Sequence, residues 1–172
     1  MKNWKSTFFI LWSGQAISIL TSAVLQLALI WHLALTTNSA FIMSIAFIAF
    51  LLPGALIGSF AGTLVDRWNR KLTIIGADLY IAAISLILVV YTLVAPLPIW
   101  LILAVLFLRS IGTAFHTPAF NAVTPLIVPE SHLTKVAGLT QTVQTFGFIA
   151  GSAVAAVALS LAKGRQYVMR PD

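Results

Sequence analysis

The chain has 172 residues, of which 60% are apolar and only 8% are charged, and its formal net charge is +6. An ordinary soluble domain carries about 25% charged residues, so this composition excludes a soluble globular protein and makes lipid the solvent of most of the surface. The positive charge does not indicate nucleic-acid binding, because the basic residues lie in clusters between apolar runs, as orientation signals of membrane proteins do. The chain contains no cysteine, which excludes disulfides and thiolate metal sites.

Five segments are long enough to cross a bilayer as helices, since each offers around 20 mainly apolar residues. In chain order they are residues 8–33, 41–64, 72–94, 99–120 and 136–161. The first is about twice as long as the apolar core of a signal peptide, so we expect an uncleaved helix. The fold class is therefore all-α and integral to the membrane, and residues 1–162 form a helical bundle.

The connections between these helices alternate in charge. Residues 36–39 and 95–98 hold no Lys or Arg, whereas residues 66–71 are densely charged and residues 117–135 read as a longer, proline-rich loop. Residues 163–172 carry further basic residues that break the alternation, and we interpret this atypical tail as a truncated end. The positive-inside rule places the N-terminus, the second loop and the fourth loop in the cytoplasm. This side holds six basic residues: Lys2, Lys5, Arg67, Arg70, Lys71 and Lys135.

Two helices carry polar stripes that suit the wall of a cavity. In the first helix the polar residues recur at spacings of three and four, and a shorter stripe with an aromatic side chain follows in the fifth helix. Amides and aromatics without fixed charge suit a large, mainly apolar solute, and hydrogen bonding between helices is an equal alternative. The candidate cavity residues are Gln15, Ser18, Ser22, Gln26, Gln141, Gln144 and Phe148.

Glycines at four-residue spacing indicate faces where neighbouring helices approach closely. In the second helix these are Gly54, Gly58 and Gly62, just after Pro53, which introduces a kink. Such a face suits helices that slide against each other, and static packing is equally consistent with it. In the fifth helix Gly147 and Gly151 make a similar face.

The charged loop opens with Gly62 and contains Asp66, Arg67, Arg70 and Lys71. This pattern resembles the signature loop between helices two and three of the major facilitator superfamily. The resemblance implies that the loop is part of a conformational gate, with Asp66 as its principal acid. A glycine usually stands where this chain has Asn69, and Asn tolerates the left-handed backbone better than most residues. The alternative, favoured for Arg70 and Lys71 taken alone, is that these basic residues only anchor the topology of the helices.

Two ionisable residues lie inside apolar spans. Arg109 is about ten residues into the fourth segment, and a central Arg costs roughly 2.5–3.5 kcal/mol, so it normally faces a partner or an aqueous cavity. Asp78 lies at a similar depth on the third segment, so we expect a buried Asp78–Arg109 pair; a purely structural pair, or contact of Asp78 with Arg67 or Lys71, is the alternative. The sequence around Arg109 also resembles the Arg-bearing motif of antiporters in the same superfamily, which implies a role in proton coupling.

The resemblance extends from residue 1 to about residue 160 and is closest to macrolide-efflux proteins of the superfamily. It rests on Trp12-x-Gly14-Gln15-Ala16, on residues 75–79 and on the stretch 108–126. It implies about twelve helices in the complete transporter and exchange of protons for a hydrophobic drug, such as a macrolide, across the bacterial plasma membrane. The alternative is a non-transporting fragment, or a membrane subunit that needs the missing C-terminal half or another polypeptide. No phosphate-binding loop, metal-ligand spacing or nucleophile–base pair occurs, so we expect neither an enzyme nor a cofactor.

Overall fold

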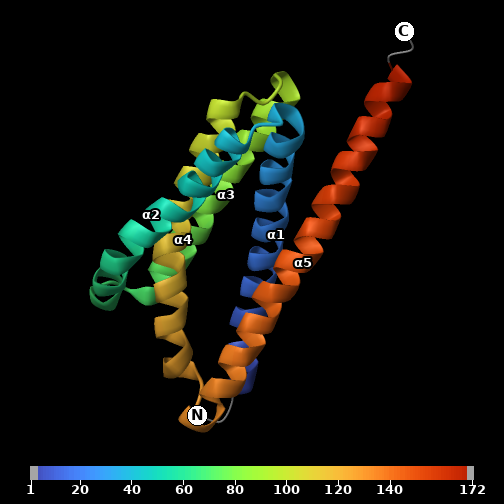
Figure 1. Cartoon of the computed structure of the whole chain (residues 1–172). Coiled ribbons are helices and arrows are strands. Elements are labelled where there is room, and N and C mark those ends of the chain that lie inside the picture. The colour runs from blue at the N-terminus through green and yellow to red at the C-terminus, as the bar shows by residue number, and fades with distance from the viewer. Residues whose placement is uncertain (1–3, 170–172) are drawn as a thin grey trace. The chain divides into compact units, whose positions relative to one another are not determined.

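The computed structural model describes the backbone of residues 4–169 and most side chains up to residue 160, apart from those at 7, 155, 158 and 159. The side chains of the predicted basic tail, residues 163–172, lie outside this description. Within the described residues the chain consists of five α-helices (Figure 1), so the prediction of an all-α chain is confirmed. Their bounds are α1 Trp4–Thr37, α2 Ala40–Arg67, α3 Arg70–Val94, α4 Ile99–Ile127 and α5 Glu130–Met169.

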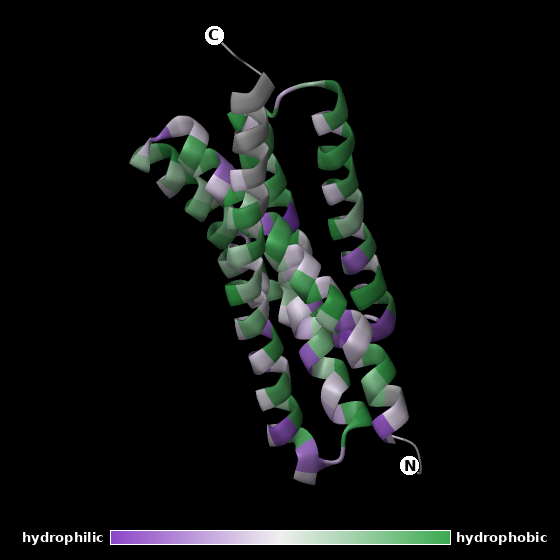
Figure 2. Ribbon diagram, turned by 90° about the vertical axis from the view of Figure 1, so that its right-hand side faces the viewer, coloured by the Kyte–Doolittle hydropathy of each residue, from purple (hydrophilic) through white to green (hydrophobic). Residues whose placement is uncertain are grey.

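Helices α1 to α4 are each long and apolar enough to cross a membrane, judged over the described residues by length and composition. Apolar residues, green in Figure 2, occur along the helices, with paler and purple residues between them. Many large apolar side chains are exposed, among them Phe41 and Val94 at 73% and 83%. Such exposure suits a surface that meets lipid rather than water.

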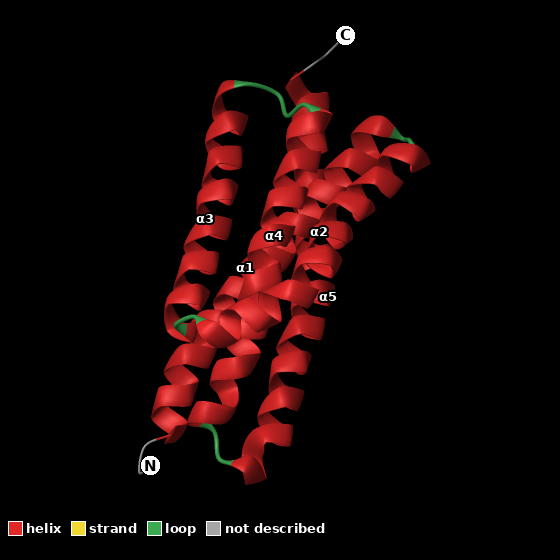
Figure 3. Cartoon of the chain, turned by 90° about the vertical axis from the view of Figure 1, so that its left-hand side faces the viewer, coloured by secondary structure: helices red, strands yellow, loops and turns green. Residues whose placement is uncertain are grey.

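The connections are short, as the green segments in Figure 3 show. Asn38, between α1 and α2, has a φ of 48°, a left-handed conformation that Asn accepts more readily than most residues. Pro98 directly precedes α4. The α4 helix ends at Ile127 because Val128 precedes Pro129 and is extended, with φ −98° and ψ 129°.

The predicted proline-rich loop over residues 117–135 is wrong, because α4 continues to Ile127 and α5 begins at Glu130. Both Pro118 and Pro125 lie inside α4. A proline within a helix removes one backbone donor, but in membrane helices neighbouring groups compensate for the freed carbonyls. Near Pro125 the side chain of Arg70 adds a donor from α3, since its Nη1 donates to the carbonyl of Ala122 at 3.1 Å, next to the Asn121 carbonyl that the proline leaves without its helical N–H.

The chain divides into two compact units. The first contains Ala40–Leu133, in which α4 packs against both α2 and α3. Its small buried cluster includes Val65 of α2, Ile74 of α3 and Ala119 of α4. The second contains Lys5–Ser39 and the chain from Thr134 onward, and there α1 packs against α5.

Candidate functional site

The charged connection between α2 and α3 is built around a helix cap. Asn69 is the N-cap of α3, and its side-chain oxygen accepts a hydrogen bond from the backbone N–H of Leu72 at 3.3 Å. Its backbone is extended, with φ −69° and ψ 104°. Asn69 therefore does not use the left-handed conformation that Asn tolerates. Asn occupies this position because its carbonyl satisfies one of the free N–H groups at the start of a helix.

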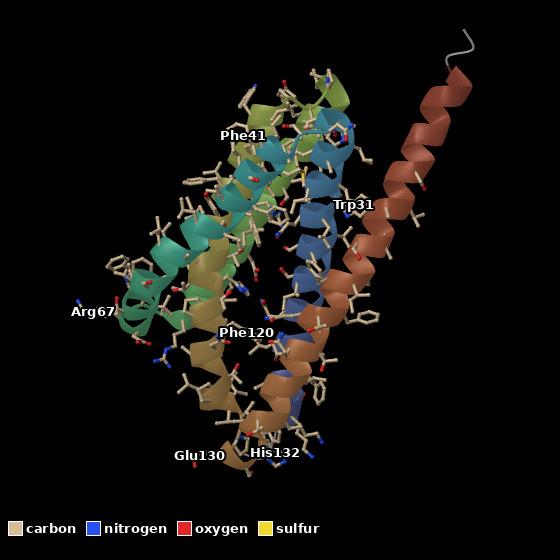
Figure 4. The ribbon with its side chains drawn as sticks, viewed as in Figure 1. Trp31, Phe41, Arg67, Phe120, Glu130 and His132 are labelled. Atoms are coloured by element: carbon tan, nitrogen blue, oxygen red, sulfur yellow. The ribbon has the colours of Figure 1, made fainter. Side chains whose placement is uncertain are left out.

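Arg70 joins this connection to α4. Its Nη2 lies 3.8 Å from Oδ1 of Asp66, one helical turn earlier, and its Nη1 donates to the carbonyl of Ala122. Arg70 therefore links the end of α2, the start of α3 and the C-terminal part of α4. Figure 4 shows Arg67 at the end of α2, on the outer margin of this unit, and Lys71 is exposed. Of the basic residues in the loop, Arg70 has the side chain that bridges elements.

The ring of Trp68 stacks on Phe115 of α4, with the ring centroids 6.1 Å apart and the planes 15° from parallel. Both rings line a pocket of about 760 Å³ whose wall is mainly α3 and α4. Arg67 borders one end of this pocket and Tyr80 the other. The sequence did not predict the pocket, because the rings come from segments almost fifty residues apart.

Helices α3 and α4 run antiparallel with a fixed register. Ile81 meets Gly112, where a Cβ would lie 2.6 Å from Cγ1 of Ile81. Toward the charged connection, Ile74 shares a cluster with Ala119. The pairs 85 with 109, 81 with 112, 78 with 116 and 74 with 119 therefore form successive rungs, because each step along one helix is matched by an opposite step along the other.

Arg109 is buried, at 7% exposure, and its Nη1 donates a hydrogen bond to the hydroxyl of Ser85 on α3. The next residue, Ser110, is also buried and accepts a hydrogen bond from the backbone N–H of Gly54 on α2 at 3.0 Å. Successive residues of α4 thus bind two different neighbours. An Arg inside the membrane needs polar partners, and Ser85 is one of them.

Asp78 lies beside His116, with 3.4 Å between Oδ1 and Nε2. Both side chains are largely enclosed, at 30% and 14% exposure, and the His116 ring stacks on Phe120. The sequence did not predict this partner, because a loop starting at residue 117 would leave His116 at a helix end, whereas α4 continues through Pro118. The predicted Asp78–Arg109 pair stays a prediction. Arg109 lies seven residues from His116 on the same face of α4, roughly 10 Å along the axis.

In the second unit α1 and α5 run parallel. The indole Nε1 of Trp12 donates to Oγ1 of Thr140 at 3.3 Å. Two turns along α5, a Cβ at Gly147 would lie 3.1 Å from the side chain of Leu20, and one at Gly151 would lie 3.1 Å from the backbone nitrogen of Val24. Both predicted packing glycines of α5 therefore lie at a close helix contact.

The predicted stripe of α1 lies on another face. At 100° per residue, Gln15, Ser18, Ser22 and Gln26 centre roughly 130° around the axis from the α1 residues that meet α5. Gln15 is buried, at 8% exposure, and the other three are partly exposed. On α5 the stripe flanks the α1 contact and is exposed; it consists of Gln141, Gln144 and Phe148.

The glycines of α2 differ from one another. A Cβ at Gly54 would lie 3.3 Å from Oγ of Ser110, which marks a close contact with α4. At Gly58 and Gly62 a Cβ would meet no atom within 4 Å among the described residues. The predicted packing face is therefore in close contact at its first glycine and open at the other two.

Nothing among the described residues groups three or more His, Asp or Glu side chains in a way that would hold a metal ion. The polar groups of the site are instead charged and hydrogen-bonding pairs between helices. Such pairs can exchange partners or protons when helices move.

Known proteins resemble the chain over most of its length. Macrolide efflux protein A of Streptococcus pyogenes is 51% identical over 159 residues, which cover 92% of this chain and 39% of that protein. The protein of the same name from Enterococcus faecalis is 51% identical over 124 residues, covering 72% of this chain and 38% of that protein. The gentisate transporter of Corynebacterium glutamicum is 30% identical over 151 residues, which cover 87% of this chain and 31% of that protein. No solved structure matches the chain.

The chain thus spans 39% of the length of the Streptococcus pyogenes relative. The family model described as Major Facilitator Superfamily matches residues 11–167. That match, with four helices able to cross a membrane, makes this a multi-pass membrane protein and not an enzyme. The chain belongs to the Major Facilitator Superfamily.

Proposed function

We propose that this chain takes part in proton-driven efflux of hydrophobic drugs, macrolides among them, across the bacterial plasma membrane. The substrate class is supported by 51% identity to macrolide efflux protein A over 92% of this chain. The orientation, with the N-terminus and the α2–α3 loop in the cytoplasm, is supported by the distribution of Lys and Arg.

The observation that carries the proton coupling is the Asp78–His116 pair. An imidazole 3.4 Å from a carboxylate gives a proton two adjacent sites in a segment where lipid excludes water. His is the side chain that normally changes charge between about pH 5 and 8. Arg109, two rungs along α4, is a fixed positive charge whose interaction with the pair changes when a proton binds. Asp78, His116 and Arg109 are thus our proton-coupling residues.

The α2–α3 loop is proposed as the gate. Arg70 holds the loop to α4 through the Ala122 carbonyl while pairing with Asp66. Releasing one hydrogen bond and one exposed ion pair costs little, since such contacts contribute on the order of 1 kcal/mol each. A modest change in substrate or proton binding is then sufficient to open or close the loop. The stripe on α1, which begins with Gln15, is proposed to face the drug.

A second candidate function is that of a membrane subunit that works with another polypeptide. The open glycines Gly58 and Gly62 favour it, because glycines in membrane helices suit close approach of a further helix and no described atom lies within 4 Å of a Cβ there. In both cases the same gate and the same proton site operate.

Uptake of a radiolabelled macrolide into drug-sensitive bacteria tests the proposal. Cells express either the 172-residue chain or the chain joined to the non-matching remainder of the Streptococcus pyogenes relative, and membrane insertion is verified for both. Lower accumulation that an uncoupler restores supports efflux; if only the joined protein achieves it, the subunit role is supported. Unchanged accumulation with both proteins inserted refutes the proposal.

The proton site has its own test in whichever protein transports. His116→Gln removes a titrating group beside Asp78, so we expect efflux to lose its dependence on pH between about 5 and 8. His132→Gln is the matched control, because His132 lies at the start of α5 and bonds Ser131. An unchanged pH profile in His116→Gln excludes this residue from proton coupling.

A further inference from the structure

The pocket beside α3 and α4 is an elongated, mostly apolar groove with one charged end. Arg67 and Trp68 border the end at the α2–α3 loop, and Tyr80 and Ile111 border the other. Its wall includes Gly76, where a Cβ would meet no atom within 4 Å among the described residues. The groove is therefore open enough to admit a chain of methylene groups.

The length of the groove matches one leaflet of a bilayer. From Asn69 to Tyr80 there are 80 − 69 = 11 residues of α3, which at 1.5 Å per residue amount to roughly 16 Å. Half of a hydrocarbon core of about 30 Å is roughly 15 Å. Since the charged loop marks the membrane surface, the apolar part of the groove reaches from the headgroup level to the bilayer centre.

The charge at the open end suits an anion. The loop carries Arg67, Arg70 and Lys71 against Asp66, a sum of 3 − 1 = +2. Because Arg70 is the side chain paired with Asp66, the positive charges of Arg67 and Lys71 stay available. Arg67 itself lines the groove. The N-terminus of the 25-residue helix α3 lies at the same end, and its partial positive charge adds to the attraction.

We propose that this groove binds an anionic phospholipid from the leaflet that borders the α2–α3 loop. One acyl chain lies along α3 past Gly76 and the Trp68 ring, and the phosphate lies at Arg67 and Lys71. Basic sites between membrane helices bind acidic headgroups in this way. A neutral drug would leave the basic end unmatched, which is why the charge favours a lipid. Bound there, the lipid is in contact with the gate loop and makes its position sensitive to lipid composition.

Tryptophan fluorescence gives a direct test on the whole 172-residue chain. The chain is reconstituted in phosphatidylcholine vesicles that contain a small fraction of lipid brominated on its acyl chains, either phosphatidylglycerol or phosphatidylcholine. Bromine quenches only nearby indoles, and subtracting the signal of Trp68→Phe isolates Trp68 from the other tryptophans. We expect several-fold stronger quenching of Trp68 by the brominated phosphatidylglycerol. Trp100 is exposed and lies at the N-terminal end of α4, away from the α2–α3 loop. Its quenching should show no preference between the two lipids.

Two variants separate the contribution of the lipid headgroup to binding from that of the acyl chain. Arg67→Gln removes one charge, worth roughly a fivefold change in affinity for an anionic lipid, so the preference should fall by that factor. Gly76→Leu fills the groove and should abolish the Trp68 quenching by either lipid. Gly138→Leu is its matched control, since Gly138 on α5 is equally open, and it should have no effect.

Equal quenching by the two brominated lipids overturns the proposal, and so does full quenching in Gly76→Leu. A macrolide that displaces the brominated lipid from Trp68 overturns it as well, because the groove would then be a drug site. None of these readouts requires transport, so they stand apart from the efflux proposal.

Discussion

Gly112 offers the sharpest test of the α3–α4 register. A Cβ at this position would lie 2.6 Å from Cγ1 of Ile81 and 2.9 Å from Cδ1 of Tyr80. Ile81 is β-branched and cannot swing its Cγ1 away without changing its one preferred rotamer. Overpacking of this kind typically costs 1–3 kcal/mol. We therefore expect Gly112→Ala to lower the free energy of unfolding by about 2 kcal/mol, although Ala is the better helix former.

The assay is thermal unfolding of the purified chain in detergent, followed by size-exclusion chromatography with fluorescence detection. For a chain of this size, 1 kcal/mol corresponds to roughly 2–4 °C in Tm, so a decrease on the order of 4–8 °C is expected. Gly76→Ala is the control, because nothing lies within 4 Å of a Cβ there, and it should leave Tm unchanged or slightly raised. In an Ile81→Ala background the nearest clashing atom is gone, so Gly112→Ala should cost less there than in the unchanged chain. If Gly112→Ala behaves like Gly76→Ala, the register is wrong.

Three further changes probe the other contacts. Gly151→Leu places atoms against the α1 backbone and should destabilise the chain by about 1–3 kcal/mol, whereas Gly138→Leu should be neutral; equal Tm values would refute the α1–α5 contact. Asn69→Ala removes the cap of α3 and should cost about 1 kcal/mol, seen as a lower Tm, and an unchanged Tm would argue against the cap. Arg70→Gln should cost about 1–2 kcal/mol through its lost bond to α4, while Lys71→Gln should cost nothing measurable; a reversed order would exclude the bridging role.

Apolar runs and charge clusters were sufficient to predict the helical fold, because a membrane helix must be about 20 residues long and its ends are marked by polar residues. The end of α4 was predicted wrongly. Pro118 and Pro125 are usually helix breakers, but in this chain the segment continues to Ile127. The actual break lies at Val128, before Pro129, so the sequence offered three prolines and no local feature to choose among them.

The partners of the buried polar residues depend on helix register, which a single sequence does not contain. Asp78 and Arg109 were recognised as unusual because each is charged within an apolar segment. The structure adds His116 as a neighbour of Asp78, because the register of α3 and α4 brings the two level. Likewise the spacing of Gly54, Gly58 and Gly62 indicated one face, but only the packing of α4 determines that Gly54 is the glycine in contact.

The proton-coupling proposal requires that Asp78 and His116 face each other across α3 and α4. Because the chain has no cysteine, the double variant Asp78→Cys/His116→Cys can be treated in membranes with a short bifunctional thiol reagent, after a protease site is placed in the loop at residues 95–98. Cross-linking should hold the two halves together after cleavage, whereas Ser85→Cys/His116→Cys, offset by roughly 10 Å along the helices, should separate. Efficient cross-linking of the second pair and none of the first would contradict the structure on which the proposal rests.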